Sequence, residues 1–356
     1  SSAASDVYKR QDWKFDESPG LGTDTDSHRL AEIGDEGVLA MIGDSTNAMV
    51  EGRTASEAEA EAGLRKVIAE AKGRVAISCF SSNVARIQSI IRAAQANDRS
   101  VAVVGRAIRR AISAAQEVGY LRDLPDFVAE DDIELLPREN IVILCTGTQG
   151  EPRAAMAKIA AGTHESVTLD PGDTVVFSSR QIPGNEPAIA RVQDGLIRRK
   201  IILITDDDAP VHVSGHPSRE EMAEMYGLVR PRIAIPVHGT ARHLVAHAEL
   251  AEHCQVHQTL LPDNGTMIRL VRAGKKGEDA EIIDTVKTGA LTHEKGKIVE
   301  IQSDMMRARR RMLWNGVVTG TLVLNREGGL CAAPAVSQTG ISNEADAADY
   351  IAAASL

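Results

Sequence analysis

Histidine side chains beside a predicted strand end are the residues of this sequence best suited to chemistry. The apolar run at 232–237 predicts a buried strand, and His238 follows it directly. His238 is therefore expected at the carboxyl end of a strand, the edge at which ligands bind in open α/β sheets. His212 and His216 precede this strand by one predicted helix, so their imidazoles can fall at the same edge.

A helix is predicted to begin just after His216, and its first turn favours an anion. Ser218 and Glu221 have the Ser-x-x-Glu spacing of a capping box, which marks a helix N-terminus. Ser214, Gly215 and His216 come just before this N-terminus. Free backbone amides and the helix dipole favour a negative group such as phosphate at that position.

Carboxylates predicted at the same edge add a second type of metal ligand. Asp44 closely follows a predicted strand, and Asp12 lies upstream of that strand. Imidazole and carboxylate together suit zinc or manganese. Spacing alone leaves two interpretations of His238 open, a metal ligand and a hydrogen-bonded histidine at a strand end. His243 and His247 are four residues apart on the next predicted helix but lack the Glu of an H-E-x-x-H motif, so we expect them on the helix surface.

Strands and helices alternate along most of the chain. Buried strands are predicted at 37–42, 75–79, 101–104, 141–145, 174–177, 200–204, 232–237 and 266–271. This order predicts an α/β fold with a mostly parallel sheet flanked by helices. Three strand-end loops, at 78–83, 146–150 and 178–185, are rich in glycine, serine and threonine and suit contacts to a sugar-phosphate chain. None of them has the spacing of a Walker or dinucleotide-binding motif.

The composition limits the classes of function. Hydrophobic residues make up 43% and charged residues 25% of the 356 residues, as in ordinary soluble globular proteins. No apolar run has membrane-spanning length, so no membrane contact is expected. The formal charge of −10 argues against a general polyanion binder but allows locally basic surfaces. Four widely spaced cysteines without a C-x-x-C pair indicate reduced thiols and a cytoplasmic location.

Six short motifs together resemble those of the ribonuclease J family, bacterial metallo-β-lactamase nucleases that carry a β-CASP insertion. The motifs are DWKFD (12–16), GDSTNA (43–48), CTGTQGEP (145–152), SSRQIPGNE (178–186), HVSGH (212–216) and PVHG (236–239). The resemblance covers the chain from about residue 12 to residue 336. It implies an α/β fold formed by the C-terminal part of a metallo-β-lactamase fold with an inserted β-CASP domain, followed by a small α+β domain.

The resemblance also implies a role for each matching residue. Asp12 matches an aspartate that bridges two metal ions, zinc with manganese as the alternative, and His238 matches a ligand of one ion. Asp44 matches an acidic catalytic residue that orients the histidines, and His216 matches a proton donor to the leaving oxygen. The positions that match substrate-binding residues are His212, Ser214, Gly215 and His216 in a phosphate pocket, and Thr146, Gly147, Ser178 and Ser179 in the walls of an RNA channel.

The sequence departs from the family pattern at the metal site. The H-x-H-x-D-H motif and a further upstream histidine, which the family uses as metal ligands, are absent. Thr240 stands where the family usually has Glu after His-Gly. We therefore expect an N-terminally truncated fragment that is inactive alone, because Asp12 and His238 are too few ligands for a two-metal centre.

The resemblance divides the chain into parts with different expected roles. The expected parts are a non-native tail at 1–11, a metallo-β-lactamase remnant at 12–55 and 206–274, a β-CASP domain at 56–205, a linker at 275–284, a C-terminal oligomerisation-type domain at 285–336 and a poorly ordered tail at 337–356. Through the C-terminal domain we expect a homodimer or homotetramer.

The expected function is metal-dependent hydrolysis of RNA in rRNA processing and RNA decay. The resemblance implies endonuclease activity and 5′-to-3′ exonuclease activity on 5′-monophosphorylated RNA, with RNA and other RNA-decay proteins as partners. The alternative is a non-catalytic RNA-binding or assembly module. A hydrolase of small phosphoesters is a third interpretation, which the β-CASP loops disfavour because they suit a polymer.

Overall fold

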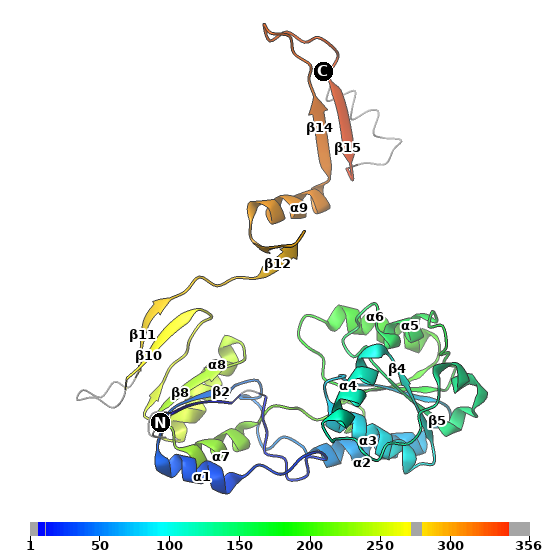
Figure 1. The fold of residues 1–356 in the computed structure, drawn as a ribbon, viewed down its shortest axis with the longest axis vertical. Helices are drawn as coiled ribbons and strands as arrows, with labels where there is room; N and C mark the ends of the chain where they lie inside the picture. The colour runs from blue at the N-terminus through cyan, green and yellow to red at the C-terminus, as the bar shows by residue number, and fades with distance from the viewer. Residues whose placement is uncertain (1–5, 11, 272–279, 342–356) are drawn as a thin grey trace. The chain divides into compact units, whose positions relative to one another are not determined.

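The computed structural model describes residues 6–10, 12–271 and 280–341, and two parallel sheets organise its larger unit (Figure 1). One sheet has four strands in the order β1-β2-β8-β9, and the other has five in the order β4-β5-β3-β6-β7. Every neighbouring pair of strands in these two sheets is parallel. The predicted α/β class is therefore confirmed.

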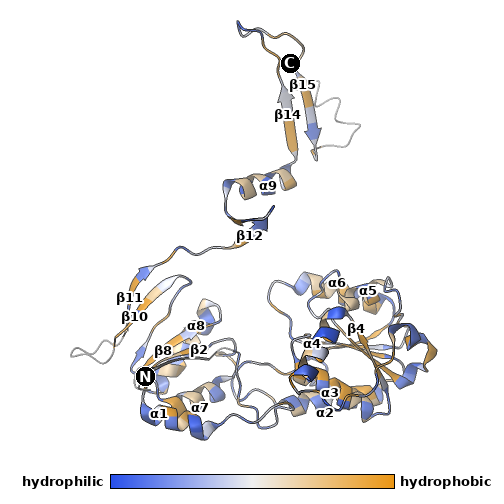
Figure 2. Cartoon of the chain, viewed as in Figure 1, coloured by the Kyte–Doolittle hydropathy of each residue, from blue (hydrophilic) through white to orange (hydrophobic). Residues whose placement is uncertain are grey.

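The five-stranded sheet is covered by helices on both faces. Its strands are β3 (Val75–Ser78), β4 (Ser100–Val104), β5 (Ile141–Cys145), β6 (Thr174–Phe177) and β7 (Ile202–Ile204), and its helices are α2 (Glu57–Glu70), α3 (Val84–Gln95), α4 (Arg106–Glu117), α5 (Ala155–Ala161) and α6 (Glu186–Arg198). Val75 and Ile77 of β3 pack with residues of α2, α3 and α4, whereas Ala76 packs with residues of α5 and α6. Burial on both faces explains why these strands are almost entirely hydrophobic (Figure 2).

The four-stranded sheet carries its helices on one face. Its strands are β1 (Asp6–Arg10), β2 (Val38–Asp44), β8 (Ile233–Val237) and β9 (Gln258–Thr259), and its helices are α1 (Ser27–Glu36), α7 (Arg219–Val229) and α8 (Ala241–His253). Met41 and Ala234 pack with residues of these three helices. On the other face, Leu39 and Ile235 pack with residues of β10 (Thr266–Leu270) and β11 (Ala280–Thr285), which pair with each other. The predicted capping box of Ser218 and Glu221 is present at the start of α7.

The smaller unit consists of short elements from the C-terminal part of the chain. Its hairpins are β12 (Leu291–Glu294) with β13 (Lys297–Glu300) and β14 (Val317–Thr321) with β15 (Ala335–Thr339), and α9 (Asp304–Asn315) lies between them in the chain. Arginines at positions 307, 309, 310 and 311 make α9 a basic helix. No described residue of α9 is buried, and Trp314 is 83% exposed.

Three segments that were expected to be terminal tails or a linker contain strands. Asp6–Arg10, which belong to the expected non-native tail at 1–11, pair with β2 through their backbone as strand β1. Ala280–Thr285 form β11 and not a linker, and the positions 275–279 of that linker lie outside the described residues. The tail expected from position 337 begins inside β15, and its positions 342–356 are likewise not described. Over the described residues, none of the helices combines the length and apolar character needed to cross a membrane.

Candidate functional site

Three neighbouring strands of the four-stranded sheet each end at a predicted site residue. Asp12 comes shortly after β1, Asp44 is the last residue of β2, and His238 follows β8 directly. Because β1, β2 and β8 are adjacent and parallel, their carboxyl ends lie at one edge of the sheet. Asp12 and His238 both adopt left-handed backbone conformations, with φ of 52° and 63°. Such conformations are uncommon in residues other than glycine and occur preferentially at functional sites.

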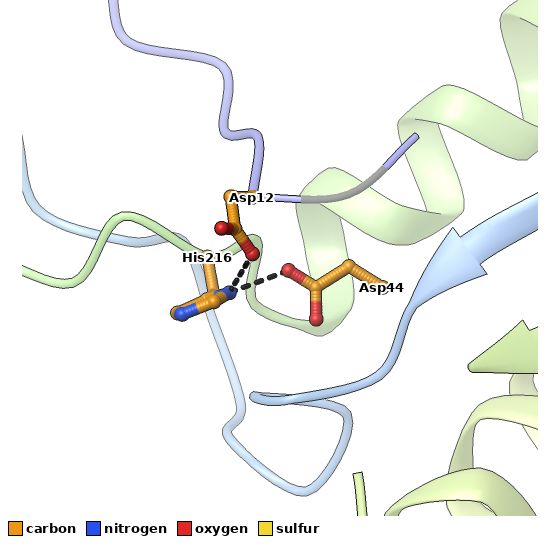
Figure 3. A group of neighbouring side chains, drawn as sticks. All are labelled: Asp12, Asp44 and His216. Carbon is orange, nitrogen blue, oxygen red and sulfur yellow. Dashed lines mark hydrogen bonds and ion pairs between the residues drawn. The ribbon is translucent and has the colours of Figure 1, made fainter. Parts of the chain in front are cut away.

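His216 completes a cluster with these residues, reaching them from the segment just before α7. Figure 3 shows His216 beside Asp12 and Asp44. Its Nδ1 lies 2.5 Å from Oδ2 of Asp44 and 3.6 Å from Oδ1 of Asp12. The same Asp12 oxygen lies 3.6 Å from Nδ1 of His238. The rings of His216 and His238 meet edge to face with centroids 5.4 Å apart. The structure therefore brings together the two residues predicted as metal ligands and the two predicted as catalytic.

The distances within the cluster distinguish metal ligands from a hydrogen-bonded pair. Two ligands of one tetrahedral zinc ion lie about 3.3 Å apart, given bonds of about 2.0 Å. The 3.6 Å between Asp12 and His238 is close to this spacing, and the distance between Asp12 and His216 is also 3.6 Å. The 2.5 Å between Asp44 and His216 is much shorter and corresponds to a charge-assisted hydrogen bond. Asp12 and His238 thus have a spacing that fits a divalent cation, whereas Nδ1 of His216 is already hydrogen-bonded to Asp44, which fits a proton-handling pair.

The Asp44–His216 hydrogen bond favours the charged form of both partners. Burial opposes ionisation of Asp44, but the hydrogen bonds from His216 and Thr46 outweigh burial and lower the pKa of the carboxyl. The hydrogen bond to Asp44 raises the pKa of His216, although burial acts in the opposite direction. His216 therefore keeps its imidazolium form to a higher pH than an ordinary histidine.

A buried row of three side chains supports the turn after Asp44. Ser45 Oγ lies 2.8 Å from Nδ1 of His247, and the Tyr226 hydroxyl lies 2.8 Å from Nε2 of the same ring. His247 is 1% exposed, so the expectation that it lies on the helix surface is wrong. Because each ring nitrogen has a hydrogen-bond partner, the buried imidazole leaves no polar atom unsatisfied. A Cβ on Gly43 would come within 3.0 Å of the ring, so glycine there leaves room for the imidazole.

His247 is expected to make the fold sensitive to acid. Burial lowers its pKa from 6.5 to about 4, so the folded chain holds the ring neutral where the unfolded chain protonates it. Stability from this residue is complete above pH 6.5, and each pH unit between 6.5 and about 4 removes about 1.4 kcal/mol. Urea unfolding at several pH values should show this slope in the wild type and a smaller one in His247→Gln. The exposed His253→Gln variant should keep the wild-type slope, and equal slopes in all three proteins would contradict the assignment.

The phosphate-pocket residues are linked to the cluster through Asn47. Its side-chain amide donates to Ser214 Oγ at 2.9 Å and to the His216 carbonyl at 3.0 Å. Ser214 Oγ also accepts from the backbone N–H of His216 at 3.2 Å. Arg180 donates to Oδ1 of the Asn47 side chain at 3.4 Å, which brings a cation from the 178–186 loop to this position. Gly215, which is exposed, continues the same turn toward α7.

His212 and Ser178, two of the predicted substrate-binding residues, both contact Arg86. The Ser178 hydroxyl donates to the Val211 carbonyl at 2.6 Å and accepts from Arg86 at 2.7 Å. It is thus already satisfied within the protein, at a residue that is 2% exposed. Burial, with the positive charges of Arg86 and others, lowers the pKa of His212 to about 3. His212 is therefore a neutral side chain at physiological pH.

The remaining predicted substrate-binding residues lie in two loops that Gln149 joins. Its side chain donates to the Arg180 carbonyl at 3.0 Å and accepts from the backbone N–H of Ile182 at 2.9 Å. Gly147 has a φ of 117°, and a Cβ there would lie 2.8 Å from Met156, so its absent side chain allows close packing against α5. Thr146 borders the same loop, and Ser179 is 5% exposed at the start of the second loop.

Four residues that support the site were not predicted as part of it: Asn47, Arg86, Gln149 and Glu221. Asn47 and Gln149 stand inside two of the motifs, so their positions were visible although their roles were not. Glu221 was recognised only as a capping residue. Nothing in the local sequence around Arg86 indicates its contact with His212, since the two residues are 126 positions apart.

Two family models and several known proteins match this chain. Residues 72–196 match the family model described as "Ribonuclease J, beta-CASP domain", and residues 209–259 match "Zn-dependent metallo-hydrolase RNA specificity domain". Ribonuclease J of Sinorhizobium meliloti is 44% identical over 319 residues, which cover 90% of this chain and 56% of that protein. Ribonuclease J of Mycolicibacterium smegmatis is 39% identical over 355 residues, covering 99% of this chain and 62% of the relative. The chain thus spans somewhat more than half the length of these relatives.

Proposed function

Because this chain belongs to the ribonuclease J family, we propose that it serves metal-dependent hydrolysis of RNA. The observation that carries the proposal is the cluster of Asp12, Asp44, His216 and His238 at the ends of adjacent parallel strands. The proposed activities are endonuclease cleavage and 5′-to-3′ exonuclease cleavage of 5′-monophosphorylated RNA. We place them in RNA decay and rRNA processing in the cytoplasm.

Asp12 and His238 would hold the metal, since their oxygen and nitrogen atoms already have the spacing of two ligands. The proposed cofactor is a pair of zinc ions, with manganese as the alternative, and bound ions would supply an activated water and neutralise phosphate charge. Among the described residues, Asp12, Asp44 and His216 form the group of potential ligand atoms that lie within 4.8 Å of one another. Within this group, Asp44 and His216 are joined by a short hydrogen bond, so we assign these two residues to proton transfer and not to metal binding.

Asp44 and His216 would handle the proton of the reaction. Asp44, held by Thr46 Oγ1 at 2.7 Å and the Thr46 N–H at 2.8 Å, fixes the His216 ring through Nδ1. When the bond between phosphorus and the 3′ oxygen breaks, the departing oxygen needs a proton. His216 would donate it, as an imidazolium that a carboxylate has oriented.

The loops around the cluster would bind the substrate. Ser214 and Gly215 lie before the N-terminus of α7, where a phosphate group is favoured. Arg180, exposed and bonded to Asn47, would add positive charge beside that phosphate. We assign Thr146, Gly147, Ser178 and Ser179 to the walls of the RNA channel, with Ser178 acting through its buried partners.

The chain contains no H-x-H-x-D-H motif, so we propose that it does not complete a two-metal centre by itself. RNA binding without cleavage is then expected of the isolated chain, and a non-catalytic RNA-binding or assembly module is the second candidate function. The exposed Leu313 and Trp314 on α9 support a homodimer or homotetramer formed through the C-terminal residues.

Metal content and RNA cleavage of the purified chain test this proposal. We expect weak zinc binding that His238→Ala reduces at least tenfold, because removing a ligand costs more than the ten- to hundredfold seen for outer-shell partners. The exposed His253→Ala variant should bind zinc like the wild type. A 5′-monophosphorylated RNA should bind without being cleaved. Tight stoichiometric zinc with His238-dependent cleavage would show instead that a complete centre forms, and failure to bind RNA would contradict the proposed function.

A further inference from the structure

Arg86 on α3 is a fully buried arginine that reaches the candidate phosphate pocket. It is 0% exposed and forms a bidentate ion pair with Glu57, with Nη2 of Arg86 2.9 Å from Oε2 of Glu57. On the other side of the guanidinium, Nη1 lies 2.7 Å from Ser178 Oγ, 3.2 Å from the Val211 carbonyl and 3.3 Å from Nδ1 of His212.

Stability alone does not explain this arrangement. Burying an ion pair costs desolvation that its Coulomb attraction often fails to recover, and apolar replacements are often as stable or more stable. An arginine that binds only for stability needs no contact with a histidine of the pocket. The contact with His212 is therefore the part of the arrangement that points to function.

The contact with Arg86 decides which nitrogen of His212 carries the proton. A guanidinium group has only N–H donors and no acceptor. Its partner nitrogen, Nδ1 of His212, must therefore present a lone pair. The Ser178 hydroxyl gives its hydrogen to Val211, so Ser178 accepts one Nη1 hydrogen, and the other is shared by the Val211 carbonyl and the imidazole. An Nδ1–H would instead point a hydrogen at the guanidinium hydrogens.

We propose that Arg86 is a positioning residue that holds His212 in the Nε2–H tautomer and thereby makes it a neutral hydrogen-bond donor to a phosphate of RNA. The phosphate part of this inference rests on the proposed function, whereas the tautomer follows from the hydrogen bonds alone. His212 then differs in role from His216, which is placed to release a proton.

The charges around His212 agree with this role. Arg86, Arg180 and Lys14 all act on the imidazole as positive charges, and burial adds to their effect. A protonated ring is disfavoured in this environment, but a neutral ring beside cations is compatible with an anion. Phosphate oxygens accept hydrogen bonds and compensate the positive charge, so this set of groups suits a phosphate better than a neutral ligand.

Nitrogen NMR of the histidine side chains tests the tautomer directly. Long-range proton–nitrogen spectra of the ¹⁵N-histidine-labelled 356-residue chain distinguish protonated from unprotonated ring nitrogens, and the His212→Gln spectrum identifies the His212 signals. We expect an unprotonated Nδ1 and a protonated Nε2 in the wild type at neutral pH. A protonated Nδ1 would overturn the proposal, whatever the chain does with RNA.

The role of Arg86 is tested by the double variant Arg86→Met with Glu57→Gln, which removes both buried charges together. His212 should then lose its single tautomer and show both forms. Arg99→Met is the matched control, because Arg99 is also buried but donates to the backbone carbonyls of Gly73 and Ala71. An unchanged His212 tautomer in the double variant would show that Arg86 does not fix it.

Binding of short RNA tests the ligand. The double variant should bind a 5′-monophosphorylated oligoribonucleotide at least tenfold more weakly than the wild type, whereas Arg99→Met should not. A loss confined to this RNA places the 5′-terminal phosphate in the pocket, and an equal loss for a 5′-hydroxyl RNA places an internal phosphate there. No loss for either RNA would overturn the ligand assignment. A wild type that binds neither RNA would overturn the proposed function and the ligand assignment with it, but the spectra would still decide the tautomer.

Discussion

Replacing Glu221 by alanine is expected to lower the free energy of unfolding by about 3–5 kcal/mol. Glu221 is 0% exposed, and its carboxylate accepts three backbone N–H groups. Oε1 accepts from Phe15 at 2.9 Å, and Oε2 accepts from Thr54 at 2.7 Å and Ser218 at 2.9 Å. Each buried donor left without a partner costs about 1–3 kcal/mol, so the loss of all three makes this the most damaging single truncation that we predict.

The expected damage extends beyond α7, because Glu221 connects three segments of the chain. The Phe15 N–H lies three residues after Asp12, so the variant should also loosen the segment that carries this proposed metal ligand. Urea unfolding followed by circular dichroism measures the stability. The exposed Glu220→Ala variant on the same helix is the control and should stay within about 0.5 kcal/mol of the wild type. Similar losses in the two variants would show that the negative charge in the first turn of α7, and not the buried hydrogen bonds, is responsible.

Replacing Asp44 by asparagine is expected to remove the charge that activates His216. The hydrogen bond to Asp44 is the largest cause that raises the pKa of His216, and burial acts against it. Without the carboxylate, burial and the charge of Arg180 should bring the pKa of His216 below its wild-type value. In any preparation that cleaves RNA, the loss of an oriented general acid should lower kcat by about a hundredfold or more.

The contribution of the Asp44–His216 pair to folding stability should fall both at high pH and at low pH. The folded-state pKa of His216 lies above the reference value of 6.5, so its contribution is complete below pH 6.5 and is lost as the pH rises through the folded pKa. The folded-state pKa of Asp44 lies below 3.8, so its contribution is present above pH 3.8 and is lost as the pH falls through the folded pKa. The pair therefore stabilises the fold most between about pH 4 and 6.5.

NMR titration of His216 in the metal-free chain measures this effect. The Asp44→Asn variant should titrate at lower pH than the wild type, whereas the exposed Asp207→Asn variant should not change the titration. If Asp44→Asn leaves the pKa of His216 unchanged, the short hydrogen bond does not control the protonation of the ring. The proposed role of Asp44 would then fail.

Local sequence patterns determined the framework of the site. Apolar runs of strand length mark β2 and β8, and alternation with helices makes these strands parallel, so Asp44 and His238 had to reach one sheet edge. The Ser218–Glu221 capping box placed Ser214 and Gly215 before a helix N-terminus. These features depend on neighbours a few positions apart, and local patterns record such neighbours well.

Tertiary structure alone decided which side chains meet and which are buried. Asp44 and His216 are 172 positions apart, and no local pattern records that their side chains lie 2.5 Å from each other. His247 was expected on the helix surface, but it is buried in the folded chain, where Ser45 and Tyr226 are hydrogen-bond partners of its two ring nitrogens. The polar Asp6–Arg10 segment forms a strand because β2 offers it a ladder of backbone partners, and tertiary context then overrides a weak local strand preference. The proton-handling pair and its buried supports are therefore products of long-range packing.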